Sequence, residues 1–341
     1  MTLSVQPTAR VSFGPPALVL IAMAAFALQD IAVKLVSPEI SLWQLMMVRS
    51  IATLGLMVVA AAVLRQGAAL VPKRWGWPML RAIFMCGAYL CFYASLPFLP
   101  VTTAAATFFT GPLMITLMAA LVLGEPIGPR RIMAVLVGFA GVVVIVRPGG
   151  ELQIAALLPL AAAFCYAVGT VLTRWRCKEE ANFALSLVHN LVYANIGMIG
   201  VMVVPLLSFD PDFVAEWRFL ASGWGEPSAL SVALILLTAA THLIGVLAIV
   251  RAYQAEDASR IAPFEYSYLA MIPALEFLIW HHVPDAMTFL GIALIALAGI
   301  FVAWREGRPV RPRVQTQGEH PWTPDAPDPW TSTEGDGKDG A

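Results

Sequence analysis

The sequence predicts an all-α membrane protein, with ten transmembrane helices arranged as two inverted five-helix repeats. Three observations predict this fold. Hydrophobic residues make up 59% of the 341 residues and charged residues only 13%, against roughly 45–50% and about 25% in a soluble domain. The hydrophobic residues form long blocks, and the two halves of the chain share one pattern of blocks. This composition excludes a water-soluble enzyme, because a soluble fold needs a polar surface.

Ten blocks are long enough to cross a bilayer, since a helix of about 20 apolar residues spans a hydrocarbon core of about 30 Å. Proline, glycine or charged residues separate the blocks, as at Ser37-Pro38-Glu39. Arg10 precedes the first block, which exceeds a signal-peptide core and is interpreted as a retained span. The predicted spans are 15–36, 41–64, 77–98, 101–123, 129–147, 154–174, 184–207, 228–251, 257–280 and 285–304.

The charge of the loops predicts the orientation. With the N-terminus in the cytoplasm, ten spans return the C-terminus to the same side. All of the 21 Lys and Arg residues then lie on that side except Lys34, Arg49, Arg147 and Arg218, and the longest opposite loop, residues 208–227, is acidic. This asymmetry follows the positive-inside rule. We therefore expect a multi-pass protein of the cell inner membrane with both termini in the cytoplasm.

An internal repeat carries the functional argument. An offset of 158 residues places spans three to five on spans eight to ten, with Gly87 on Gly245 and Pro126 on Pro284. Each half has an odd number of spans, so the two halves have opposite orientations in the membrane. Inverted repeats are typical of secondary transporters, which bind substrate near the midplane where the repeats meet.

The repeat also sets the expected domain organisation. Residues 1–14 form a cytoplasmic segment, residues 15–147 the first repeat and residues 154–305 the second. Residues 306–341 are rich in proline, glycine and acidic residues. We expect this tail to be disordered, because it has too few apolar residues to offset the loss of chain entropy.

Several motifs resemble the EamA branch of the drug/metabolite transporter superfamily, and the likeness extends over about residues 15–305. His281-His282 departs from it, since the second repeat often has Gly-Glu at that place. The residues that carry the resemblance are Phe-Ala-Leu-Gln-Asp-Ile-Ala-Val-Lys at 26–34, Trp43-Gln44, Arg49-Ser50, Leu-Gly-Glu-Pro at 123–126, Ala-Ser-Arg-Ile-Ala-Pro-Phe-Glu-Tyr at 258–266 and Val-Pro-Asp at 283–285.

The resemblance implies a ten-helix carrier whose central cavity is formed largely by spans 1, 3, 4, 6, 8 and 9. The family is similar to carriers of amino acids, vitamins, nucleotide-like metabolites and drugs. It therefore implies a small organic substrate, moved by alternating access, and leaves the identity of the substrate open.

Ionisable residues within the spans are candidates for substrate binding or ion coupling, because a charge in hydrocarbon is costly and usually faces a cavity. Glu265 shares one predicted helical face with Tyr268 and Glu276, and is expected to take up a proton or a cationic group; the alternative is a structural ion pair. Asp30 is either part of the cavity wall or an i,i+4 partner of Lys34. Arg49 either pairs with an acid or binds a substrate carboxylate or phosphate.

Aromatic and hydroxyl side chains complete the expected binding site. Tyr89 and Tyr93 lie one helical turn apart, and together with Tyr166 they offer faces for a flat or cationic ligand. Thr107 either lines the cavity or donates to the backbone of its own helix. His242 either relays protons or has a hydrogen-bonded packing role.

The main functional prediction is a secondary transporter of an amino-acid-like, vitamin-like or drug-like metabolite, with a proton as the candidate coupling ion. An uncoupled channel is the first alternative. An acyltransferase-like membrane enzyme using His281 and Asp285 is the second. No cofactor or metal site is expected. The net charge of −1 does not indicate nucleic acid as a partner. Small residues on spans five and ten fit either intrachain packing or a homodimer; these are Gly138, Gly141, Gly291 and Gly299.

Overall fold

The computed structural model describes the chain over five ranges, and within them it contains helices and no strands. The predicted N-terminal segment and C-terminal tail lie outside the described residues, apart from Gly14 and Glu306 at their edges. The described ranges are residues 14–63, 70–124, 127–146, 154–256 and 258–306.

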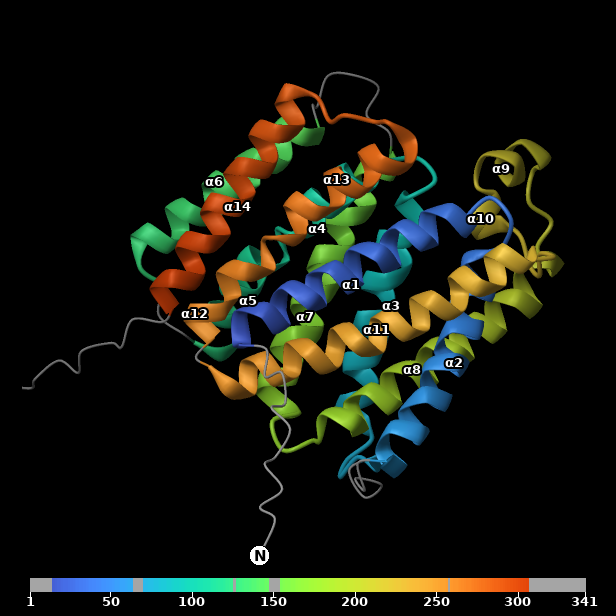
Figure 1. Cartoon of the computed structure of the whole chain (residues 1–341), viewed down its shortest axis with the longest axis horizontal. Coiled ribbons are helices and arrows are strands. Elements are labelled where there is room, and N and C mark those ends of the chain that lie inside the picture. The colour runs from blue at the N-terminus through green and yellow to red at the C-terminus, as the bar shows by residue number, and fades with distance from the viewer. Residues whose placement is uncertain (1–13, 64–69, 125–126, 147–153, 257, 307–341) are drawn as a thin grey trace, which may run out of the picture. The chain divides into compact units, whose positions relative to one another are not determined.

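The first half of the chain contributes six helices to the bundle in Figure 1. They are α1 (Pro15–Val36), α2 (Leu42–Val63), α3 (Gly76–Ser95), α4 (Val101–Phe108), α5 (Gly111–Leu123) and α6 (Pro129–Val146).

The second half begins with a short 3-10 turn, Ile154–Leu157, and a second 3-10 turn, Val204–Leu206, follows α8. Its helices are α7 (Leu158–Arg176), α8 (Asn182–Val203), α9 (Pro211–Glu216), α10 (Arg218–Ala221), α11 (Ala229–Ala255), α12 (Ala258–Glu265), α13 (Tyr268–Trp280) and α14 (Ala286–Glu306).

The prediction of a multi-span helical protein is confirmed. Among the described residues, nine segments are long and apolar enough to cross a membrane, counting Val101–Leu123 as one. They correspond to nine of the ten predicted spans. The other predicted span, 257–280, consists of the two shorter helices α12 and α13.

Two predicted spans are interrupted, at corresponding places in the two halves. The first interruption, Phe109–Thr110, separates α4 from α5, and the second, Tyr266–Ser267, separates α12 from α13. Both are tightened by i,i+3 bonds, such as Thr110 N to Thr107 O at 3.2 Å and Ser267 N to Phe264 O at 3.1 Å. The 158-residue offset places the two interruptions within one residue of each other. Interrupted helices in matching positions are typical of transporter repeats.

Helices of the first half pack chiefly against helices of the second half. The four most extensive helix contacts are α1 with α11, α3 with α7, α6 with α14 and α2 with α8. Figure 1 shows α6 and α14 side by side at one edge and α1 beside α11. In the predicted repeats α1 corresponds to α7, and α3 corresponds to α11. The α1–α11 contact therefore has the α7–α3 contact as its counterpart. This pattern is compatible with the predicted inverted repeats.

The small residues of α6 and α14 are used for packing within the chain. A Cβ atom on Gly141 would lie 2.9 Å from the carbonyl oxygen of Gly291, and one on Gly291 would lie 2.7 Å from the carbonyl oxygen of Gly141. Only glycine permits the two backbones to approach so closely. These two glycines therefore pack against each other within one chain, as the first of the two alternatives predicted, and not across a homodimer.

One end of the bundle carries residues 204–228, and we call it the capped end. There the side-chain amide of Gln44 exchanges two hydrogen bonds with the backbone of Gly225, at 3.0 and 2.8 Å. The indole of Trp43 donates to Leu220 O at 2.7 Å. Glu39 accepts from the Ser231 hydroxyl at 2.7 Å and from Ser228 N at 3.0 Å. The Ser231 hydroxyl contributes most to holding the pKa of Glu39 below its usual value.

The other end carries Arg74, Arg174 and Arg251, and we call it the basic end. The loop before α3 and the loop before α8 meet there, because Glu180 accepts from the backbone N–H groups of Lys73 and Arg74 at 2.8 and 2.9 Å. Basic residues thus gather at the end opposite the acidic 204–228 segment. This arrangement agrees with the charge asymmetry predicted from the loops.

Glu276 joins three helices at the capped end. Its carboxylate, which is 2% exposed, accepts from the N–H groups of Val101 and Thr102 at 2.8 and 3.1 Å. These N–H groups belong to the first turn of α4, which has no intrahelical acceptor for them. Lys34 lies 3.7 Å from the same carboxylate and donates to Leu99 O at 2.8 Å. Glu276 therefore ties α13 and α1 to the start of α4.

We predict that Gly141→Ala destabilises the protein and Gly55→Ala does not. The new methyl group at position 141 must displace the backbone of Gly291, and overpacking of this kind costs about 1–3 kcal/mol. A methyl group at position 55 meets nothing within 4 Å and favours the helix by roughly 1 kcal/mol. Thermal unfolding of the two detergent-purified variants checks the expectation, and equal melting temperatures would contradict it.

We predict that Glu276→Ala lowers the apparent melting temperature by several degrees. The substitution leaves two buried N–H groups without an acceptor, at a cost of about 1–3 kcal/mol each. Glu276→Gln keeps one carboxamide oxygen as acceptor and should lose less. The matched control is Glu216→Ala in the exposed helix α9. A melting temperature for Glu276→Ala equal to that of the control would show that this cap contributes nothing.

Candidate functional site

A buried carboxylate connects α1, α3 and α13. Asp30 accepts hydrogen bonds from the hydroxyl of Tyr93, at 2.6 Å, and from the hydroxyl of Tyr268. The amide of Gln29 donates to the Tyr93 hydroxyl at 2.7 Å and lies 3.4 Å from Asp30. Three donors thus surround one carboxylate, which is the arrangement a buried charge requires. The predicted i,i+4 pairing with Lys34 is wrong, because Lys34 lies against Glu276 instead.

A second group of polar and aromatic side chains surrounds Arg49. The guanidinium carbon of Arg49 lies 4.5 Å from the centroid of the Tyr89 ring, a cation–π contact. Arg49 is 1% exposed, and its Nε atom donates to no atom of the described residues. Tyr89 in turn packs edge-on against Tyr93 at 4.4 Å and Tyr193 at 5.1 Å. The structure therefore places five predicted site residues in one cluster: Asp30, Arg49, Tyr89, Tyr93 and Tyr268.

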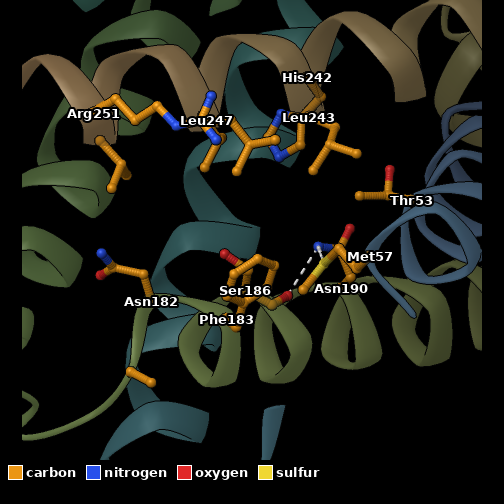
Figure 2. Close-up of a pocket in the computed structure, with 13 residues that line it drawn as sticks. Thr53, Met57, Asn182, Phe183, Ser186, Asn190, His242, Leu243, Leu247 and Arg251 are labelled. Atoms are coloured by element: carbon orange, nitrogen blue, oxygen red, sulfur yellow. Dashed lines mark hydrogen bonds between the residues drawn. The ribbon is translucent and has the colours of Figure 1, made fainter. Parts of the chain in front are cut away.

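A cavity of about 280 Å³ lies beside this cluster, between α2, α8 and α11. Figure 2 shows residues of α8 on one side and residues of α11 on the other. The cavity extends from the basic end toward the middle of the bundle, with Arg251 and Asn182 near its mouth and His242 and Asn190 at its inner end. Its lining consists of Thr53, Met57, Ala181, Asn182, Phe183, Ser186, Asn190, His242, Leu243, Val246, Leu247, Val250 and Arg251.

Asn190 is the polar side chain at the inner end with an unused atom. Its Nδ2 donates to Ser186 O at 2.9 Å and lies 3.9 Å from the sulfur of Met57, as the dashed lines in Figure 2 indicate. Its Oδ1 is buried and accepts no hydrogen bond from the described residues. A buried amide oxygen without a donor is unfavourable, so this atom is available to a bound molecule.

Aromatic and imidazole rings connect the cavity to the buried cluster. The ring of His242, which lines the cavity, lies 6.5 Å from that of His189. His189 stacks on Tyr193 at 4.0 Å, and Tyr193 contacts Tyr89. Thr53 belongs to the lining and donates to the carbonyl oxygen of Arg49, one helical turn deeper in α2, at 2.9 Å. The cluster therefore lies directly beyond the inner end of the cavity.

Glu265 lies apart from both groups. It is the last residue of α12, and the Tyr253 hydroxyl donates to it at 2.5 Å. The predicted single face through Glu265, Tyr268 and Glu276 is wrong, because the helix is interrupted directly after Glu265. The three side chains instead serve three different contacts, near the basic end, at the cluster and at the capped end.

Thr107 and Tyr166 both lie close to the interruption between α4 and α5. The Thr107 hydroxyl donates to Thr103 O at 2.9 Å, which is the predicted intrahelical alternative. The Tyr166 ring packs against Phe108 at 5.4 Å, and its Cδ1 atom would lie 3.2 Å from a Cβ atom on Gly111. Tyr166 thus covers the interrupted backbone, and neither residue lines the cavity.

Much of the cavity lining was not predicted. Asn182, Ser186 and Asn190 follow one another at intervals of four residues in α8, and Thr53 follows Arg49 at the same interval in α2. Such spacing places polar side chains on one helical face, so the signal was present in the sequence. Among the described residues there is no group of three or more His, Cys, Asp or Glu side chains able to hold a metal ion.

Comparison with known proteins finds a family domain in the first half of the chain and a set of similar transporters. Residues 16–147 match the EamA-like transporter family. The chain is 27% identical over 242 residues to the riboflavin transporter of Vibrio cholerae serotype O1, covering 70% of this chain and 75% of that protein. It is 26% identical over 287 residues to the pseudopaline exporter CntI of Pseudomonas aeruginosa, covering 83% and 93%.

A third relative is the S-adenosylmethionine uptake transporter of Rickettsia bellii, 23% identical over 237 residues, covering 69% of this chain and 75% of that protein. All three relatives are transporters of small metabolites, and not enzymes. The family match and these relatives confirm the resemblance inferred from the motifs. The chain is thus a multi-pass membrane protein that carries an EamA-like domain in its first half and is similar to transporters of small metabolites.

Proposed function

We propose that this protein is a secondary carrier of the inner membrane that moves a small organic metabolite by alternating access. The observation that carries the proposal is the difference between the two ends of the bundle. A cavity of about 280 Å³ reaches inward from the basic end. The capped end is joined by hydrogen bonds from Trp43, Gln44 and Glu39 to residues of the other half. A carrier needs one open and one closed side in each of its states.

The basic end is proposed to face the cytoplasm. The positive-inside rule assigns loops rich in Lys and Arg to that side, and Arg74, Arg174 and Arg251 lie there. The described conformation would then be the inward-facing state. The cavity is built within a single chain, so the proposal does not need a homodimer.

The substrate class follows from the size of the cavity and the names of the relatives. Riboflavin, S-adenosylmethionine and pseudopaline are the compounds named for the three transporters to which the chain is similar. A cavity with an apolar wall and a few polar groups suits metabolites of that kind. One of these relatives is an uptake transporter and another is an exporter, so the proposal includes both directions of transport.

A proton is the proposed coupling ion, with Glu265 as the group that takes it up. Glu265 is half-buried near the basic end, and its carboxylate is held by Tyr253. It lies about two helical turns beyond the loop after α11, on the same side of the bundle as the basic end, and is proposed to exchange protons with the water there. Asp30 is less suited to this role, since three donors already stabilise its charged form.

We predict substrate flux that saturates and depends on a proton gradient. Purified protein in liposomes is exposed to a metabolite mixture under a proton gradient of either direction, and accumulation is followed by mass spectrometry. Glu265→Gln should lose accumulation but keep exchange down a substrate gradient. Glu216→Gln, in the exposed α9, is the matched control. Non-saturable flux would indicate a channel, and equal accumulation by Glu265→Gln would remove this residue from coupling.

We predict that a cysteine at position 186 is labelled from the cytoplasmic side only. Ser186 lines the cavity near its mouth, whereas Ser228 lies at the capped end. In a background with the four native cysteines replaced by serine, a membrane-impermeant maleimide should modify Ser186→Cys in inside-out vesicles and Ser228→Cys in right-side-out vesicles. The opposite result would invert the proposed orientation.

A further inference from the structure

We infer that the cavity binds an organic anion, with its anionic group at the mouth beside Arg251 and the start of α8 and a hydrogen-bond donor at its far end on Asn190. The inference rests on the proposed carrier function and specifies the class of its substrate. Three observations support it: an unused acceptor at the inner end, positive groups at the mouth, and an apolar wall between them.

The inner end requires a donor. Asn190 is 1% exposed, and its Nδ2 donates to Ser186 O, which fixes the orientation of the amide and leaves Oδ1 facing no donor of the described residues. The neighbouring Thr53 hydroxyl already donates to Arg49 O at 2.9 Å. A substrate N–H or O–H group is therefore the partner that satisfies Asn190 when the cavity is filled.

The mouth favours an anion. Ala181, Asn182 and Phe183 line it, and they form the N-terminus of the 22-residue helix α8. The N-cap residue, Ala181, has no side chain able to accept from the first N–H groups, so the positive end of the helix dipole is uncovered. Figure 2 shows Arg251 of α11 facing the cavity from the side opposite Asn182. Together they supply to one anionic group a guanidinium and the first N–H donors of α8, which no side chain of the described residues caps.

Among the described residues, no carboxylate lines the cavity and competes for these groups. Of the 13 described lining residues, drawn in Figure 2, Arg251 is the one with a permanent charge, and neither Asp nor Glu is among them. Beyond the inner end, Arg49 adds positive charge one turn below Thr53. The electrostatic field in the cavity therefore favours a negative ligand over a positive one.

The spacing of the two ends sets the length of the substrate. Eight residues of α8 separate Asn182 from Asn190, which corresponds to about 12 Å along the helix axis. Between them Phe183, Leu243 and Leu247 form an apolar wall. The matching ligand has a carboxylate or phosphate at one end, an apolar or aromatic body, and an N–H or O–H group at the other end.

Three related probes separate the two recognition points. 4-Hydroxycinnamate has both the anion and the donor, its methyl ester lacks the anion, and 4-methoxycinnamate lacks the donor. Binding to the full-length protein in a neutral detergent is measured by tryptophan fluorescence. Wild-type protein should bind 4-hydroxycinnamate roughly tenfold or more tightly than either analogue, as expected for one lost charged or buried hydrogen bond.

The variants should lose one preference each. Arg251→Gln should remove most of the preference over the methyl ester and keep that over the methoxy compound. Asn190→Leu should remove most of the preference over the methoxy compound and keep that over the methyl ester. Asn190→Ala should give the same result with a side chain too small to fill the cavity. Arg218→Gln, exposed in α10, is the control for loss of a basic residue. Melting temperatures of all variants establish that each is folded.

Four results would overturn the inference. They are equal affinities of wild-type protein for the three probes, absence of saturable binding of 4-hydroxycinnamate at millimolar concentration, unchanged preferences in folded Arg251→Gln and Asn190→Leu, and displacement by lipid. The last is tested in nanodiscs of phosphatidylcholine and phosphatidylglycerol. Weaker probe binding in the anionic lipid alone would assign the mouth to a lipid headgroup. Carrier function fails separately, by absence of saturable flux of every compound in liposomes.

Discussion

The need to bury one carboxylate shapes the centre of this protein. Asp30 lies in α1, and its donors come from α3 through Tyr93 and from α13 through Tyr268. A charge in an apolar interior is stable only if hydrogen bonds replace the water it loses. The three helices are consequently fixed at one point, although two of them belong to the first half of the chain and one to the second. The rest of the bundle extends from this contact, with Arg49 and its tyrosines on one side and the interrupted α13 on the other.

Interruption of two helices makes this contact possible. In an unbroken helix Glu265, Tyr268 and Glu276 would share a face, and one environment would have to satisfy two carboxylates and a phenol. The interruption after Glu265 gives each side chain its own partners, which are Tyr253, Asp30 and the start of α4. The backbone groups released at the interruption are largely satisfied by i,i+3 bonds, as a membrane interior demands.

Hydropathy sufficed to predict where most helices lie, because crossing a bilayer requires a continuous apolar segment whatever the tertiary structure. The interruption of the segment from 257 to 280 was not predictable in this way, since hydropathy does not mark it and neither Tyr266 nor Ser267 is a glycine or proline. The same limit applies to the site. Asp30, Tyr93 and Tyr268 were selected as intramembrane polar residues, but their mutual contact joins residues up to 238 positions apart. Asn190 was not predicted as a binding residue, because the neighbouring sequence does not reveal that its side-chain oxygen lacks a donor in the folded protein.

The contact between α2 and α8 has a mechanical consequence. Near the capped end a Cβ atom on Gly197 would lie 2.7 Å from Met47 N, so the two helices touch backbone to backbone, whereas farther along they diverge around the cavity. Gly197 thus marks a pivot, and the arm from there to Asn182 is about 22 Å long. A rotation of about 10° around this pivot would move the start of α8 by about 4 Å, comparable with the width of a side chain. Small angular changes at a glycine contact are therefore enough to widen or collapse the cavity without separating the helices.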